Sequence, residues 1–101
     1  MRALYCGFLL AAMSAASGAV AADSGHGQVL AQSHCAPCHI IAPNQRGEVA
    51  AAPPFDVIGR KHGFDVEMLA QAMRAPHPKM NFSPSAADAA DIAAYIGTLP
   101  R

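Results

Sequence analysis

The chain has 101 residues, of which 52% are hydrophobic and 14% are charged. Seven Lys and Arg residues balance seven Asp and Glu residues, so the formal net charge at pH 7 is zero. A chain of this length forms at most one small domain, and its neutral charge argues against a nucleic acid as partner and against strong electrostatic steering of a charged protein partner.

The N-terminal segment is organised like a secretory signal peptide. Arg2 precedes an apolar segment at 3–13, and the residues at 14–22 are mostly small, with two small-x-small patterns that fit cleavage. The apolar segment is about half of the ~20 residues that span a bilayer, which argues against a retained membrane anchor. We therefore expect residues 1–22 to be removed, leaving 23–101 as one periplasmic domain without a membrane span.

A short helix is expected at His26 to His34, with Asp23 or Ser24 as its N-cap. Gly27 lies inside this helix, where glycine costs roughly 1 kcal/mol relative to alanine. Its presence indicates either a frayed first turn or a position where another helix crosses closely. The helix leads directly into Cys35.

The sequence C-A-P-C-H at 35–39 is the attachment signature of a c-type haem. The thiols of Cys35 and Cys38 would add to the two haem vinyl groups, and His39 would place its imidazole against the iron. A C-x-x-C pair also occurs in redox dithiols and in zinc sites. A thioredoxin-like dithiol needs a βαβ context and a zinc site needs a second pair of ligands, and the sequence shows neither. We therefore expect one covalently bound haem c.

The segment after the motif is irregular in sequence. Residues Ile40 to Pro54 show no sustained hydrophobic period and contain several prolines, so we expect a loop. Phe55, Val57 and Ile58 then form a short apolar cluster, consistent with one helical turn that ends at Gly59.

A second main helix is expected after Asp65, which can act as its N-cap. Leu69 and Met73 lie on its apolar face. Pro76 must end it, because proline lacks the backbone donor and disfavours a helical residue before it. The segment Ala75 to Ser83 is expected to be irregular.

The last helix has signals at both ends. Ser85 and Asp88 form a capping box, with Ser83 as the alternative N-cap and Pro84 as the first helical residue. Gly97 is a candidate for the residue just beyond the C-terminus. Tyr95 lies at the border of the apolar face, where its ring can pack while its hydroxyl stays in water. The apolar face consists of Ala89, Ile92, Ala93 and Ile96. No strand-like alternation occurs, so the sequence predicts an all-α fold.

The iron position opposite His39 could take a methionine or a histidine, or it could be open. Met73 lies on the apolar face of its helix, where core packing is the usual role, and Met68 lies on a helical flank. Met80 stands in the irregular segment, where its thioether can point inward without disturbing a helix. We expect Met80 to be the ligand, with His77 as the alternative.

The order of these features resembles that of the small monohaem class I c-type cytochromes. The resemblance rests on residues 27–39, on Ala-Pro-Pro-Phe at 52–55 and on residues 80–99, and it covers essentially the whole mature chain. It implies a cytochrome c-like all-α fold, in which three main helices and long loops surround the haem. It also implies that the N- and C-terminal helices cross near Gly27 and Tyr95.

The resemblance further implies that a proline after the motif supports His39, with a nearby backbone carbonyl accepting its Nδ1 proton. We assign this role to Pro53, with Pro43 as the alternative. In the family the methionine ligand is often followed by proline, whereas here Asn81 follows Met80. We expect the following side chains to line or support the haem pocket: Pro53, Phe55, Leu69, Met73, Phe82, Ile92, Tyr95 and Ile96.

Ligation by His39 and Met80 would leave no position on the iron for a substrate. The expected function is therefore one-electron transfer between a redox protein donor and a redox protein acceptor, rather than catalysis. Two alternatives remain at this point. One is a cytochrome c subunit of a larger dehydrogenase or oxidase, instead of a monomeric carrier. The other is a haem enzyme or gas sensor with an open sixth position.

Overall fold

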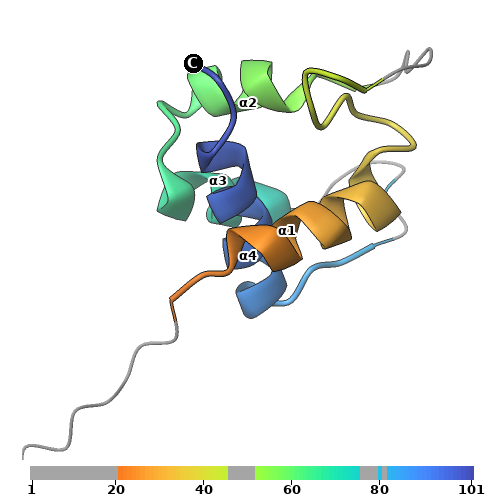
Figure 1. Ribbon diagram of the computed structural model, residues 1–101. Helices are drawn as coiled ribbons and strands as arrows, with labels where there is room; N and C mark the ends of the chain where they lie inside the picture. Colours follow the sequence, from red (N-terminus) through yellow and green to blue (C-terminus); the bar gives the residue numbers. More distant parts are fainter. Residues whose placement is uncertain (1–20, 46–51, 76–79, 81) are drawn as a thin grey trace, which may run out of the picture.

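The computed structural model describes residues 21–45, 52–75, 80 and 82–101. All regular elements in these residues are helical, which confirms the predicted all-α class (Figure 1). No helix in this part of the chain is long and apolar enough to cross a membrane. The elements are α1 (Ser24–Leu30), the π-helical turn η1 (Ala31–Cys35), α2 (Phe55–Lys61), α3 (Val66–Arg74) and α4 (Ala86–Gly97).

The first helix begins two residues earlier than predicted. Asp23 is its N-cap and accepts a hydrogen bond from the backbone N–H of His26 at 3.0 Å. Helix α1 then continues without a break into η1, where the N–H of Ala36 reaches the carbonyl of Ala31, five residues back, at 2.9 Å. Such π-helical turns occur frequently at functional sites, and this one ends at Cys35.

Helices α1 and α4 cross in direct backbone contact at Gly27 (Figure 1). Gly27 is buried, and a Cβ atom at this position would overlap the carbonyl group of Asp91. The glycine is therefore the close-crossing residue that the resemblance implied. On α4 the contact falls at Asp91 and Ile92, about one turn before Tyr95.

Two polar groups of α1 bind the carboxylate of Asp91 at this crossing. The backbone N–H of Asp23 donates to Oδ1 at 2.8 Å, and His26 Nδ1 lies 2.7 Å from Oδ2. The backbone hydrogen bond from Asp23, followed by the side-chain hydrogen bond from His26, lowers the pKa of Asp91. The hydrogen bond to Asp91 raises the pKa of His26. The ion pair therefore joins the start of α1 to the middle of α4.

Helix α3 has the boundaries that the sequence indicates. The Asp65 side chain accepts from the N–H of Met68 at 2.9 Å, and Ala75 is extended, with ψ at 154°, just before Pro76. Helix α3 packs against α4. The core lies at this contact, where the largest fully buried side chains are Leu69 of α3 and Ile92 and Ile96 of α4.

Helix α4 begins as predicted and ends one residue later. The Ser85 hydroxyl accepts from the N–H of Asp88 at 3.1 Å. Gly97 is the last helical residue, and Thr98 is the C-cap in a helical conformation. Gly97 therefore does not lie beyond the helix end.

The prediction that a single turn ends at Gly59 is wrong. Helix α2 continues to Lys61, and Gly59 is buried inside it. The Phe64 ring packs on Gly59, where a Cβ atom would overlap it. The left-handed backbone of Gly63 and Phe64, with φ values of 60° and 54°, returns the ring to this position. The glycine thus makes room for an aromatic ring instead of ending a helix.

The prediction that the Tyr95 hydroxyl stays in water is also wrong. Tyr95 is 6% exposed, and its hydroxyl donates to the backbone carbonyl of Ile41 at 2.7 Å. Burial raises the pKa of this phenol. The hydrogen bond joins α4 to the segment that follows the C-x-x-C-H motif.

We expect Gly27→Ala to destabilise the haem-loaded protein by about 1–3 kcal/mol or more, because the new methyl group overlaps backbone that cannot rotate away. Urea unfolding followed by circular dichroism measures the loss. Gly97→Ala is the matched control: its Cβ would meet Val66 at an ordinary 3.7 Å, and alanine favours the helix by up to about 1 kcal/mol. Equal stability of the two variants would contradict the close crossing.

The ion pair between His26 and Asp91 makes a pH-dependent contribution to stability. Because the pKa of His26 is raised, the stabilisation that its charge contributes is fully present below pH 6.5. That stabilisation is lost as the pH rises through the folded-state pKa of His26. Because the pKa of Asp91 is lowered, the stabilisation that its carboxylate contributes is fully present above pH 3.8. That stabilisation is lost as the pH falls through the folded-state pKa of Asp91. The pair therefore stabilises most between these two pH values.

We expect His26→Gln to lower the urea midpoint most within this window and progressively less at alkaline pH. Glutamine keeps a hydrogen-bond donor and removes only the charge. Other titrating groups are present in both proteins, so the difference between their midpoints isolates the pair. A difference that does not change with pH would show that the charge on His26 contributes nothing.

Candidate functional site

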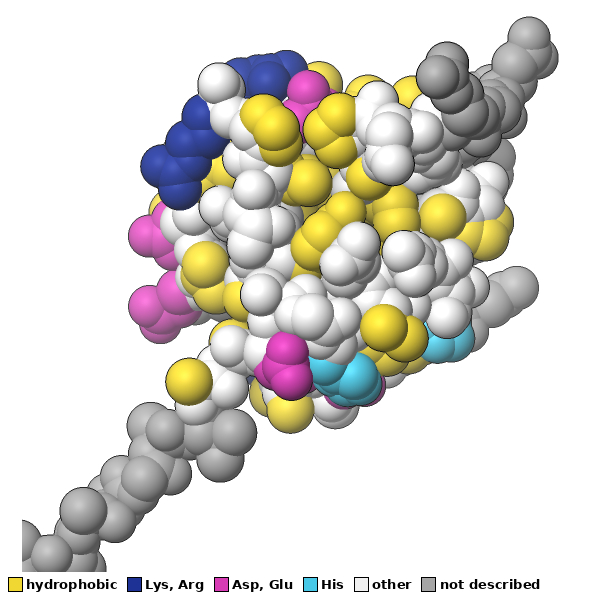
Figure 2. Space-filling model, in the orientation of Figure 1, with side chains coloured by type: hydrophobic (Ala, Val, Ile, Leu, Met, Phe, Trp, Pro, Cys, Tyr) yellow, Lys and Arg dark blue, Asp and Glu magenta, His cyan; other side chains and the backbone are white. Residues whose placement is uncertain are grey.

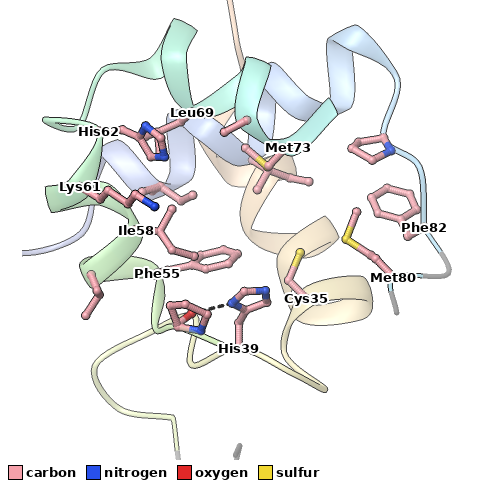
Figure 3. A pocket seen from close by; sticks show the side chains of 16 residues that line it. Cys35, His39, Phe55, Ile58, Lys61, His62, Leu69, Met73, Met80 and Phe82 are labelled. Carbon is pink, nitrogen blue, oxygen red and sulfur yellow. Dashed lines mark hydrogen bonds between the residues drawn. The ribbon is translucent and has the colours of Figure 1, made fainter. Parts of the chain in front are cut away.

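A cavity of about 300 Å³ lies between α2, α3, α4 and the end of η1 (Figure 3). Its walls are almost wholly apolar, and its volume is at the lower end of the range for ligand pockets. Ten of the predicted site residues line it: Cys35, His39, Pro53, Phe55, Leu69, Met73, Met80, Phe82, Ile92 and Ile96.

Two predicted site residues do not line the cavity. Cys38 is exposed, and Tyr95 is buried, with its hydroxyl donating to the carbonyl of Ile41. The sequence places Tyr95 at the border of the apolar face of its helix, whereas in the structure it supports the segment at Ile41 and does not line the cavity. Six lining residues were not predicted: Val57, Ile58, Lys61, His62, Ala72 and Pro84.

A tight turn after η1 arranges the C-x-x-C-H motif. The carbonyl of Cys35 accepts hydrogen bonds from the N–H groups of Cys38 at 3.0 Å and His39 at 2.8 Å. Cys35 and His39 are consequently both buried against the cavity, and Cys38 is left at the surface. Burial raises the pKa of the Cys35 thiol to about 11.

The ring of His39 is oriented by a backbone carbonyl. His39 Nδ1 lies 2.6 Å from the carbonyl oxygen of Pro53, the residue predicted for this role from the sequence. Since a carbonyl only accepts, Nδ1 carries the proton, and Nε2 carries the lone pair that can bind a metal. The Phe55 ring lies 5.4 Å from the imidazole, tilted by 52°. Figure 3 shows the imidazole at one wall of the cavity.

Gln45 holds the backbone that follows His39. Its Nε2 donates to the carbonyl of His39 at 3.1 Å, and its Oε1 accepts from the N–H of Ile41 at 2.7 Å. The N–H of Phe55 also donates to the carbonyl of Ile40 at 2.8 Å. No sequence pattern predicts this role for Gln45, because an isolated glutamine in a loop has no characteristic pattern.

Two methionines line the cavity from different elements. Met73 belongs to α3, and Met80 lies in non-helical backbone. In Figure 3 Met80 lies on the side of the cavity near Cys35 and Phe82. His77, the alternative ligand, falls outside the described residues.

Phe82, two residues after Met80, contacts the residue that precedes the C-x-x-C-H motif. The Phe82 ring stacks on the imidazole of His34, with 3.9 Å between the centroids and 6° between the planes. His34 belongs to η1 and directly precedes Cys35. This contact joins the two chain segments that carry Cys35 and Met80.

The donor set suits a covalently attached haem. An oriented imidazole nitrogen, two thioether sulfurs and the thiol of Cys35 surround an apolar space, and Cys38 lies just outside it. Imidazole and thioether are the axial ligands of electron-transferring c-type haems. An apolar wall suits the macrocycle, because burial there removes apolar surface from water.

The sequence is 47% identical to cytochrome c-552 of Bradyrhizobium diazoefficiens over 92 residues, which are 90% of this chain and 88% of that protein. A match of this length necessarily spans both residues 35–39 and Met80. No protein-family model matches the chain, and no solved structure matches it.

Proposed function

Because this chain belongs to the small monohaem class I c-type cytochromes, we propose that it carries single electrons between periplasmic redox proteins, with His39 and Met80 as the axial ligands of its haem iron. The protein is an electron carrier rather than an enzyme, and its cofactor is a covalently bound haem c. When bound, this cofactor supplies reversible one-electron exchange at iron.

We assign the two thioether bonds to Cys35 and Cys38. Their separation in the motif lets both sulfurs reach one edge of a porphyrin, and the turn at Cys35 places His39 beside them. Cys35 lines the cavity, and Cys38 is exposed to water. The haem edge near Cys38 would therefore be the exposed part through which electrons pass.

The hydrogen bond from His39 to the Pro53 carbonyl is the observation that carries the proposal. It fixes the tautomer and the orientation of the imidazole, so that Nε2 carries the lone pair that a metal ligand uses. A histidine that binds a metal through Nε2 needs this arrangement, because the proton must then be on Nδ1. Phe55, the first residue of α2, packs against the imidazole ring of His39 and shields it from water.

Met80 is favoured over Met73 as the second ligand because of the backbone that carries it. Met73 is held by α3, where its side chain packs against the core cluster. Met80 lies in non-helical backbone, and the stacking of Phe82 on His34 holds the segment close to the cavity. If His39 and Met80 hold the iron, no position on it would remain for a substrate.

We expect Met80→Ala to remove the sulfur–iron charge-transfer band of the oxidised protein and to let the reduced protein bind CO. Met73→Ala is the matched control, since it removes a thioether from the same cavity and should leave the band intact. Absorption spectra of the purified haem proteins measure both effects. Loss of the band in the Met73 variant alone would reverse the assignment, and a wild-type protein that lacks the band and binds CO at once would refute axial ligation by methionine.

We further propose that residues 1–22 act as a signal peptide and that the mature domain, 23–101, works in the periplasm. The intact mass of the haem protein from a periplasmic extract should equal that of a chain beginning at Ala22 or Asp23 plus one haem. A mass that still contains the first twenty residues would contradict export with cleavage.

A further inference from the structure

Two polar side chains of the cavity wall have no role in the proposal above. Lys61 is the last residue of α2, and His62 is its C-cap. Both line the cavity, whose other described lining residues are apolar apart from Cys35 and His39. Lys61 is the only residue of this described lining with an ammonium group.

Lys61 and Cys35 lie on opposite sides of the cavity, and the Lys61 side chain extends from α2 toward its interior (Figure 3). The two carboxylates of haem, its propionates, lie on the edge of the macrocycle opposite the vinyl groups. Thioether bonds at Cys35 and Cys38 would therefore turn the propionate edge toward the end of α2.

A carboxylate that enters an apolar wall needs a cation or hydrogen-bond donors, because an unpaired charge in such surroundings is strongly unfavourable. Arg60 is the neighbouring cation, but its guanidinium binds Asp56 at 3.3 Å, and it does not line the cavity. Figure 2 shows Lys and Arg side chains gathered at one corner of the face that it draws. Arg60 and Lys61 are the two basic residues in the last turn of α2.

We propose that Lys61 binds a haem propionate through its ammonium group, with His62 as a second polar contact on the same edge. The proposal rests on haem attachment at Cys35 and Cys38. A cation paired with a propionate also offsets the negative charge close to the iron. Because reduction adds an electron to the iron, this positive charge favours the reduced form and raises the midpoint potential.

The test compares Lys61→Gln with Arg60→Gln, which removes the same charge one residue away on a side chain outside the cavity. Redox titration of the purified haem proteins should show a negative shift of the midpoint potential in Lys61→Gln and little shift in Arg60→Gln. Lys61→Arg should retain most of the wild-type potential. The infrared difference spectrum between the oxidised and reduced states should show a displaced propionate carboxylate band in Lys61→Gln alone.

Equal shifts in the two glutamine variants would overturn the proposal, since the effect would then be one of general charge. An unchanged carboxylate band in Lys61→Gln would overturn it as well. If the Lys61→Gln variant does not accumulate, the reduced wild-type protein is measured by NMR instead. Nuclear Overhauser contacts between the Lys61 ε-protons and the propionate methylenes would support the proposal, and their absence would refute it. The pyridine haemochrome spectrum tests haem attachment separately, because it reports thioether bonds whatever Lys61 contacts.

Discussion

The close crossing of α1 and α4 is the contact on which the arrangement of the site depends. No side chain separates the two backbones at Gly27, so α1 is held directly against α4, and the end of η1 reaches the cavity that Ile92 and Ile96 of α4 also line. Cys35 therefore meets the same cavity as these two side chains. The hydrogen bonds from the N–H of Asp23 and from His26 to the Asp91 carboxylate also join the two helices, at the residue of α4 that Gly27 contacts.

The cavity and the protein core share their walls. Leu69, Ile92 and Ile96 are the most deeply buried large side chains, and all three also line the cavity. A chain of this size can build only a small core of its own. A bound macrocycle would thus complete the apolar interior, so that cofactor binding and folding stability depend on the same side chains.

Local signals in the sequence predicted much of this structure. The caps at Asp65 and Ser85, the end of α3 before Pro76 and the all-α class follow from short-range rules, and they agree with the structure. Gly27 stood out because a glycine inside a helix has a cost, and of its two predicted explanations the structure confirms the close helix crossing.

The features that sequence reasoning missed depend on contacts between distant residues. The Tyr95 hydroxyl reaches Ile41 across 54 positions of sequence, and the packing of Phe64 on Gly59 requires two left-handed residues between them. Lys61 reached the cavity because α2 is longer than the apolar cluster indicated. No local pattern distinguishes these residues from ordinary surface or helix-ending positions.

The π-helical turn η1 fixes the length of the segment between the crossing and the motif. Each residue of an α-helix turns the chain by about 100°, and η1 contains a turn of five residues at the point where Cys35 must face the cavity. Inserting or deleting one residue between Gly27 and Cys35 would leave a helix but would turn the thiol away from the cavity. This segment therefore tolerates changes of side chain far better than changes of length.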